Sequence, residues 1–259
     1  MFSRNKKLLV TTAFLLSTFT FVLAGPIEDC AEYSKLGVPG NQGTLLCRAG
    51  HLLAHSPEYK TPMWVIERLT AEKANGSASK RESVRFQADP DLAKGERAEL
   101  ADYKGSGYDR GHMAPAADMK WGLQAMKECF YLSNMVPQVG VGMNQGIWKD
   151  LEENVRTWAI NRGELYIFTG PIYDSGTKKT IGKNGVAVPT HLYKIAYDPG
   201  KNEAIAFLMP NEKLKSSDMP KYIVTIRDVE EKTGLDFLSN LEKSLQDTIE
   251  TEKAKGLWQ

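Results

Sequence analysis

The sequence has few cysteines, no excess of charge of either sign and only one long apolar run. Its 259 residues include three cysteines, and its 33 basic and 32 acidic side chains nearly cancel. This composition, with 42% hydrophobic residues, excludes a disulfide-dense miniprotein, a collagen-like chain, a disordered tail and a polytopic membrane protein. If such a chain binds nucleic acid, it must use a local basic cleft, because it has no global positive charge.

The apolar run lies at the beginning of the chain. Three basic residues precede the run over residues 8–23, and small residues follow from Ala24 onward. This pattern predicts a secretory signal peptide over residues 1–24. An uncleaved anchor is the alternative, although the run is shorter than the roughly 20 residues that a membrane span needs. We expect a secreted or periplasmic protein without stable membrane association after cleavage.

The three cysteines fit export to an oxidising compartment. There, a disulfide between Cys30 and Cys47 is the expected state, and it would tie down residues 25–60 as an N-terminal extension. Cys129 has apolar neighbours, which favours a buried structural thiol over a nucleophile. The chain has no CxxC pair, which argues against a structural zinc site.

Apolar periodicity predicts one strong helix and several strands. Apolar residues recur at spacings of three and four over residues 147–159, and Asn144 lies where it could cap the first turn. Residues 71–108 are mostly loop by their polarity. The expected strands cover residues 63–69, 130–136, 165–169, 186–197, 204–209 and 222–226, and a polar helical tail includes residues 238–251. No repeat or linker divides residues 25–259, so the prediction is a single α+β domain with a mainly antiparallel central sheet flanked by helices.

Three polar segments carry the chemistry. The first is GYDRGHMAP at residues 107–115, where an acid, a base and a glycine expected to form a turn precede His112. The second is LSNMVPQ at residues 132–138, and the third is MNQGIW at residues 143–148, which leads into the predicted helix. The four histidines are spread over the chain and do not resemble a metal cluster.

Taken together, these segments resemble the DNA/RNA non-specific endonucleases with a ββα-metal site, most closely the endonuclease G branch. Further similar runs extend the resemblance over nearly the whole mature chain: WVIERL at 64–69, ADYKGSGYDRGH at 101–112, TGPIY at 169–173, GKNGVAVPTHLYK at 182–194 and MPNE at 209–212. The resemblance implies a sugar-non-specific endonuclease that cuts DNA and RNA to 5′-phosphorylated pieces. It also implies contact with the phosphate backbone without base specificity, and a homodimer is plausible.

The resemblance assigns the central roles to three residues. His112 would be the general base, a role that suits an imidazole titrating near neutral pH. Asn144 would be the single direct protein ligand of one Mg²⁺, with Mn²⁺ as a possible substitute. Glu152 follows Asn144 by eight residues, about two helical turns, and would reach the ion only through water.

Arginines are expected to contact the phosphate. Arg110 could clamp phosphate or pair with a neighbouring acid, and substrate contact is favoured. Arg156, four residues after Glu152, could form a surface ion pair with it, but the resemblance favours a phosphate-facing role. The family also uses an upstream arginine to stabilise the transition state; Arg81 and Arg85 are both candidates, and Arg81 is favoured.

Two further residues are expected to support the site. Asp109 could bind the metal, but its place at the head of the motif favours a structural carboxylate that braces the loop. Asn134 is expected beside the substrate, where it would orient His112 or hold the loop. His191 is expected to be an ordinary structural residue.

Basic residues near the motif are expected to line one groove, although the chain is nearly neutral overall. They are Lys80, Arg81, Arg85, Lys104, Arg110, Lys120 and Lys127. A catalytically idle nucleic-acid-binding or uptake protein on the same scaffold is the alternative function. A phosphodiesterase of lipids or small esters is disfavoured, because its pocket should be lined mostly by apolar side chains.

Overall fold

The central feature of the protein is one antiparallel sheet. The computed structural model describes residues 30–174 and 179–259, so the predicted signal peptide lies outside the described residues. Within those residues, no helix has the length and apolar character needed to cross a membrane. The sheet has seven strands in the order β1-β2-β3-β6-β9-β10-β11, and each neighbouring pair is antiparallel.

The strands of the main sheet are β1 (Thr44–Cys47), β2 (Leu52–Ser56), β3 (Thr61–Thr70), β6 (Glu164–Ile172), β9 (His191–Asp198), β10 (Glu203–Pro210) and β11 (Ile223–Val224). Two separate pairs are β4 (Asp109–His112) with β5 (Met135–Gln138), and β7 (Thr180–Ile181) with β8 (Val186–Ala187). The helices are α1 (Ala31–Ser34), α2 (Ala71–Ala74), α3 (Leu100–Tyr103), α4 (Leu123–Glu128), α5 (Trp148–Arg162), α6 (Ile226–Thr233) and α7 (Lys243–Thr251). The remaining helical segments, which are not regular α-helices, are η1 (Arg81–Ser83), η2 (Ala116–Met119), η3 (Leu132–Asn134), η4 (Gly140–Ile147) and η5 (Ser216–Tyr222).

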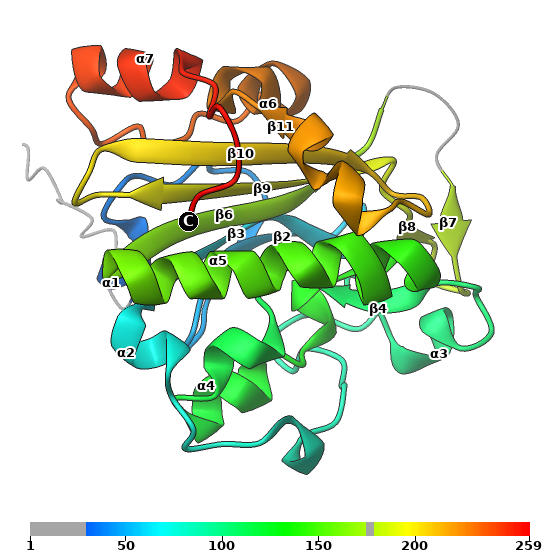
Figure 1. Cartoon of the computed structure of the whole chain (residues 1–259). Coiled ribbons are helices and arrows are strands. Elements are labelled where there is room, and N and C mark those ends of the chain that lie inside the picture. The colour runs from blue at the N-terminus through cyan, green and yellow to red at the C-terminus, as the bar shows by residue number, and fades with distance from the viewer. Residues whose placement is uncertain (1–29, 175–178) are drawn as a thin grey trace, which may run out of the picture.

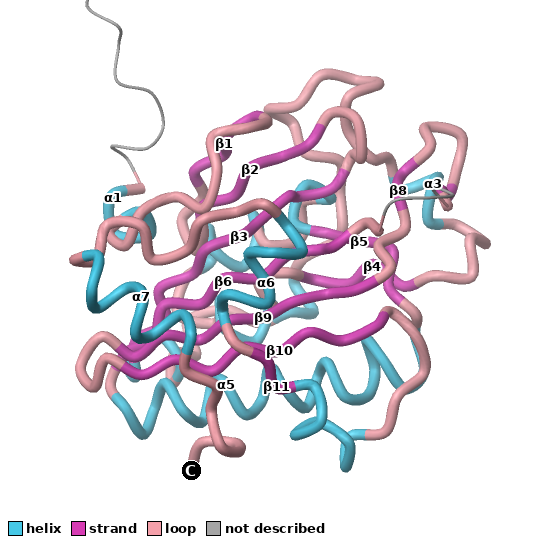
Figure 2. The backbone as a smooth tube through the Cα atoms, turned by 90° about the horizontal axis from the view of Figure 1, so that it is seen from above, coloured by secondary structure: helices cyan, strands magenta, loops and turns pink. Residues whose placement is uncertain are grey.

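Each face of the sheet has its own hydrophobic core, because successive side chains of a strand point to opposite faces. One core joins the strands to α5 and to the segment around β4 and β5, for example through Val65 and Leu151. The other joins them to α6 and α7, for example through Ile66 and Val229. Figures 1 and 2 show α5 along one face and α6 and α7 on the other. The predicted α+β domain is confirmed.

Helix α5 confirms the predicted helix. Its buried residues, Trp148, Leu151, Val155, Trp158 and Ala159, form the expected stripe against the sheet. The helix ends at Gly163, whose φ of 95° lies in the region that favours glycine.

Several other predictions need correction. Residues 130–136 form the turn η3 followed by the start of β5, since β5 covers only Met135–Gln138. The strand expected at 222–226 is reduced to β11, because a Thr225 capping box begins α6 directly afterwards. Strands β1 and β2 lie within the predicted N-terminal extension and were not foreseen. The first turn of α5 is not capped by Asn144, since Ile147 occupies the cap position.

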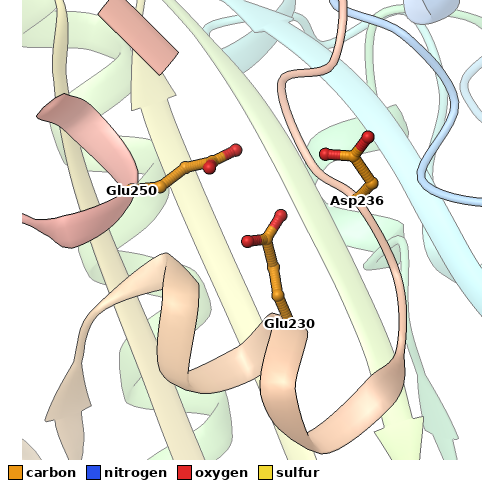
Figure 3. A group of neighbouring side chains, drawn as sticks. All are labelled: Glu230, Asp236 and Glu250. Atoms are coloured by element: carbon orange, nitrogen blue, oxygen red, sulfur yellow. The ribbon is translucent and has the colours of Figure 1, made fainter. Parts of the chain in front are cut away.

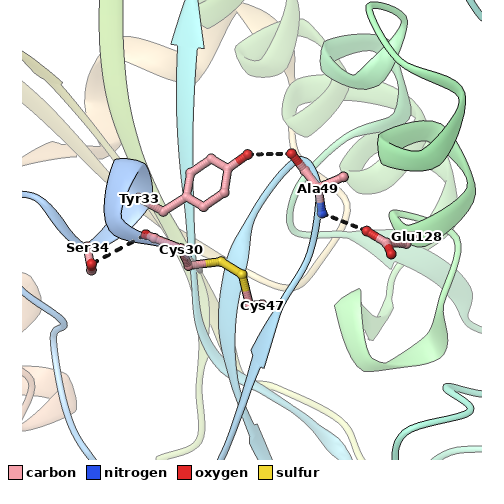
Figure 4. The surroundings of a disulfide bond; sticks show 6 residues. All are labelled: Cys30, Tyr33, Ser34, Cys47, Ala49 and Glu128. Atoms are coloured by element: carbon pink, nitrogen blue, oxygen red, sulfur yellow. Dashed lines mark hydrogen bonds between the residues drawn. A yellow bond between two sulfur atoms is a disulfide. The ribbon is translucent and has the colours of Figure 1, made fainter. Parts of the chain in front are cut away.

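The N-terminal extension is fastened to the sheet by the expected disulfide between Cys30 and Cys47. The surrounding contacts are shown in Figure 4, where the Tyr33 hydroxyl donates to the Ala49 carbonyl at 2.5 Å. The Ala49 amide donates to Glu128 Oε2 at 2.6 Å, which links this loop to the end of α4. The described part of this extension, residues 30–60, therefore contributes two strands to the sheet and is not a peripheral excursion.

Candidate active site

The two polar motifs before α5 pair with each other as strands. In the β4–β5 ladder, Gly111 lies opposite Val136 and His112 lies opposite Met135. Gly111 is in a strand and not in the expected turn. A Cβ at Gly111 would lie 2.0 Å from Gln138 Oε1 and 2.7 Å from Gln138 Cβ, so glycine leaves the space that Gln138 occupies. This pairing places His112 at the end of β4, next to η4 and α5.

Asn134 holds the chain that follows His112. Its side-chain oxygen accepts from the Ala114 amide at 3.0 Å, and its Nδ2 donates to the carbonyls of Ala114 and Cys129, each at 2.9 Å. The Asn134 carbonyl also accepts from the Met113 amide at 3.0 Å. Asn134 is fully buried, and these contacts are those of the loop-holding alternative rather than of the expected substrate contact.

Asp109 fixes the two amide side chains of η4. Its Oδ2 accepts hydrogen bonds from Asn144 Nδ2 at 2.9 Å and from Gln145 Nε2 at 2.7 Å. The backbone of η4 departs from helical geometry at Gly146, so Asn144 lies on an irregular turn and not on α5 itself. With its NH₂ group held by Asp109, Asn144 has its amide oxygen free to bind a cation. Asp109 thus has the bracing contacts expected of it.

A cavity of about 830 Å³ brings the predicted residues together. Its wall contains Asn144, Glu152 and Arg156 from η4 and α5, and Asp109, Arg110 and His112 from β4. The remaining lining residues are Arg81, Phe86, Leu100, Tyr103, Lys104, Tyr108, Pro115, Ala116, Ala117, Gln145, Lys149 and Glu153. Of the predicted site residues, Asn134, the alternative arginine Arg85 and the disulfide cysteines Cys30 and Cys47 do not line this wall.

His112 lies at the buried end of the cavity, with 8% of its surface exposed. The rings of Phe86 and Phe130 flank it at centroid distances of 5.4 and 5.0 Å. Burial lowers the pKa of His112 to about 3, and the charges of Arg81 and Arg110 act in the same direction. The imidazole is therefore neutral at pH 7, which is the form that can accept a proton.

Glu152 and Arg156 face the cavity from successive turns of α5. Burial raises the pKa of Glu152 to about 7. Arg156 does not pair with Glu152 in a surface ion pair; its Nη1 donates to Asp118 Oδ1 at 2.5 Å. Asp118, in η2, is buried and was not foreseen from the sequence. It holds Arg156 at the cavity wall and joins η2 to α5.

The arginines of the cavity are held differently. The Arg110 guanidinium lies over the Phe86 ring at 4.2 Å from the ring centroid. In this position the N–H groups at the edge of the guanidinium can donate hydrogen bonds to an anion. Arg81 lines the cavity and Arg85 does not; Arg85 instead donates to the carbonyls of Glu82 and Val84. Of the seven basic residues expected in one groove, only Arg81, Lys104 and Arg110 line this cavity.

The residues present fit a hard divalent cation. Mg²⁺ prefers oxygen ligands, and the cavity offers the oriented amide oxygen of Asn144 and the carboxylate of Glu152. Two residues that the sequence reasoning missed, Gln145 and Lys149, also line the cavity. Gln145 stands directly after Asn144 in the MNQGIW segment, and this was the one signal that could have revealed it.

An acidic cluster outside the cavity has a structural explanation. Glu230, Asp236 and Glu250 gather between α6 and α7 (Figure 3). Arg227 pairs with Glu230 at 3.0 Å and with Glu250 at 2.8 Å, which accounts for this cluster without a cation.

Two single residues agree with the sequence expectations. His191 pairs with Asp174 at 3.2 Å and does not line the cavity. Cys129 is a buried free thiol whose pKa is raised by burial, as expected for a structural cysteine.

Comparison with known proteins gives one consistent result. Residues 31–244 match the model of the DNA/RNA non-specific endonuclease family. Nuclease C1 of Cunninghamella echinulata var. echinulata is 38% identical over 223 residues, covering 81% of this chain and 88% of the relative. Mitochondrial endonuclease G of Homo sapiens is 35% identical over 223 residues, covering 81% of this chain and 74% of the relative. The crystal structure of the EndoG/EndoGI complex superposes with a TM-score of 0.79 at 32% identity, covering 83% of this chain and 94% of that chain. The chain therefore belongs to the DNA/RNA non-specific endonuclease family, whose members are metal-dependent phosphodiester hydrolases.

Proposed function

We propose that this protein hydrolyses phosphodiester bonds in DNA and RNA without base specificity, leaving 5′-phosphate ends. The observation that carries the proposal is the shared cavity, in which His112, Asn144 and Glu152 lie with the guanidinium groups of Arg110 and Arg156. Hydrolysis of a phosphodiester needs an activated water and neutralisation of the charge that develops on the phosphate. The cavity holds groups suited to both tasks.

His112 acts as the general base in this proposal. Its neutral imidazole takes a proton from the attacking water, and the aromatic rings around it keep bulk water away. Arg110 and Arg81 bind the nonbridging phosphate oxygens. Arg156, fixed by Asp118, supplies a further positive charge from the helix side.

Asn144 would be the direct ligand of one Mg²⁺, with Mn²⁺ as a substitute. The contact with Asp109 points its amide oxygen away from that carboxylate. Glu152 would accept hydrogen bonds from water on the ion. A cation held there would stabilise negative charge on the phosphate and on the leaving 3′ oxygen.

The experiment is nicking of a supercoiled plasmid and cleavage of a transcript, with Mg²⁺ and with EDTA. We expect cleavage that EDTA abolishes, 5′-phosphate product ends, and a loss of about 10²–10⁴-fold in kcat for His112→Ala. His191→Ala, which changes a histidine outside the cavity, is the matched control and should keep wild-type activity. Binding without cleavage would instead support an idle nucleic-acid-binding protein.

The same proposal extends to compartment and assembly. The Cys30–Cys47 disulfide supports a secretory or periplasmic route, although some relatives are mitochondrial by name. Mass mapping of the nonreduced protein should give a chain that starts after Ala24 and contains that disulfide. Light scattering tests the homodimer, which is proposed only from the family resemblance.

A further inference from the structure

The hairpin of β7 and β8 lies next to one wall of the candidate active site. Its two strands pair with each other, apart from the main sheet. Figure 2 shows β8 beside α3, and Leu100 and Tyr103 of α3 line the cavity. The proposed reaction assigns no role to this hairpin, although it borders the place where a substrate would bind.

Asp102 of α3 fastens the hairpin to the cavity wall. Its Oδ1 accepts a hydrogen bond from the Asn184 amide at 3.1 Å, and its Oδ2 accepts from Asn184 Nδ2 at 2.8 Å. The Glu99 amide, at the start of α3, also donates to Asp102 Oδ2 at 2.8 Å. A Cβ at Gly182 would lie 2.3 Å from the Asp102 Cα, so the hairpin and α3 are in close contact there. Because Asp102 is only 2% exposed, water does not compete for these hydrogen bonds.

Apolar contacts reinforce this attachment. Ile181 of β7 and Val186 of β8 belong to a small buried cluster that also contains Tyr103 of α3 and Met135 of β5. Strand β5 pairs with β4, the strand that ends at His112. The hairpin, α3 and the β4–β5 pair are therefore packed together, and the hairpin has a fixed place relative to the candidate active site.

Lys179, the residue before β7, reaches the rim of the cavity. Its Nζ lies 5.0 Å from the centroid of the Tyr108 ring, a cation–π contact. Tyr108 lines the cavity, and so does Arg110, two residues further along the chain. Two residues of extended chain span about 7 Å. The Lys179 ammonium therefore lies at the edge of the cavity, beside the strand that carries Arg110.

The positive charges on this side of the cavity have no acidic partner within the described part of the chain. Lys104, Arg110 and Lys179 are exposed, and none of their side chains forms an ion pair or a hydrogen bond there. By contrast, the exposed Lys221 and Lys243 pair with acids at 2.7 and 2.8 Å. Unpaired cations beside a cavity suited to phosphate attract a polyanion, because each phosphate they bind releases counterions.

We propose that the β7–β8 hairpin extends the nucleic-acid-binding surface beyond the cavity, with Lys179 binding a backbone phosphate of the substrate away from the scissile bond. The inference rests on the proposed function, because it concerns the nucleic acid that the cavity would cleave. An ammonium binds phosphate as a point charge and does not read the bases. Lys179 therefore contributes affinity and no chemistry. A lysine that only covered the Tyr108 ring would not change how DNA binding depends on salt.

The test measures binding of a short fluorescein-labelled DNA duplex by fluorescence anisotropy, in EDTA and at salt concentrations from about 50 to 200 mM. For Lys179→Gln we expect the salt slope of the affinity to fall by about one, and the affinity at the lowest salt to fall about tenfold. Lys179→Glu should bind more weakly still. Lys201→Gln is the matched control and should keep the wild-type slope. Lys201 is also exposed, but it lies in the β9–β10 turn, near the Arg162 end of α5.

A salt slope in Lys179→Gln equal to that of the wild type would overturn the inference. With Mg²⁺, the same variant should raise KM for DNA cleavage and keep the wild-type kcat, whereas a lower kcat at an unchanged KM would also contradict the assigned role. The binding measurement needs no cleavage, so it separates the two proposals. A wild-type protein that binds DNA but does not cleave it would refute the proposed function, while the salt slopes would still show whether Lys179 contacts a phosphate.

Discussion

His112 and Glu152 share one cavity, and burial favours the uncharged form of each. The pKa of His112 is lowered to about 3, whereas the pKa of Glu152 is raised to about 7. At pH 7 the imidazole is therefore neutral while the carboxyl is close to its midpoint. The two groups differ in the pH at which they change charge, and activity should follow the one that titrates nearer neutrality.

This difference predicts the acid limb of the activity profile. As the pH falls below about 7, Glu152 gains a proton and loses its charge, so kcat/KM of the free enzyme should fall. His112 stays neutral over the same range and does not contribute. Glu152→Gln should lower the plateau and remove this limb, whereas Asp150→Asn, on α5 outside the cavity, should keep the wild-type midpoint. If the acid limb of the profile persists in Glu152→Gln, that limb reports the titration of another group.

A second prediction at this scale concerns the upstream arginine. Arg81 lines the cavity, whereas Arg85 in the same segment does not. Arg81→Ala should raise KM and reduce the salt slope of substrate affinity by about one, because one phosphate contact is lost. Arg85→Ala is the matched control and should keep the wild-type slope. The measurement is KM over a series of salt concentrations. Equal salt slopes in the two variants would show that Arg81 does not contact the phosphate.

Among the elements, α5 was predictable and the strands next to it were less so. The spacing of Leu151, Val155 and Trp158 predicts α5, because these apolar residues lie on the one face of the helix that is buried. Short paired segments such as β4 and β5 carry no such pattern, since they bury polar residues such as His112 and Gln138. The family resemblance predicted the residues of the proposed site, but only the fold shows that Asp109 holds Asn144 and that Asp118 holds Arg156.

The disulfide gives a prediction at the scale of the N-terminal element. The bond links residues 17 apart and fastens α1 to β1, so it restricts the unfolded chain. Its loss should lower the free energy of unfolding by about 3 kcal/mol. Urea unfolding of the wild type with and without reductant measures this. The double variant with Cys30→Ser and Cys47→Ser should resemble the reduced wild type and should not respond to reductant.

At the scale of the whole molecule, buried histidines make the free energy of unfolding depend on pH. His51 is fully buried, neither ring nitrogen has a hydrogen-bond partner among the described residues, and burial lowers its pKa to about 3. A folded-state pKa below the unfolded value makes the stabilisation complete above about pH 6.5 and reduces it as the pH falls toward 3. This pH dependence was not predictable from the sequence, because His51 belongs to no motif.

The resulting prediction is a change in acid sensitivity on replacing His51. Between pH 7.5 and pH 5, the linkage through His51 costs the wild type about 2 kcal/mol of unfolding free energy. His51→Leu lacks this titration, so its loss of stability over the same range should be smaller by that amount. Urea unfolding of both proteins at the two pH values measures the difference. The same pH dependence in both would mean that His51 is protonated in the folded protein.

The proposed nuclease activity depends most on the arrangement of His112 and Asn144 around one phosphate. A crystal structure of His112→Ala with Mg²⁺ and a short DNA duplex measures this arrangement directly. We expect the cation on the Asn144 amide oxygen and the scissile phosphate between that cation and the space left by the imidazole. A cation bound away from Asn144, or a phosphate held outside this cavity, would contradict the account.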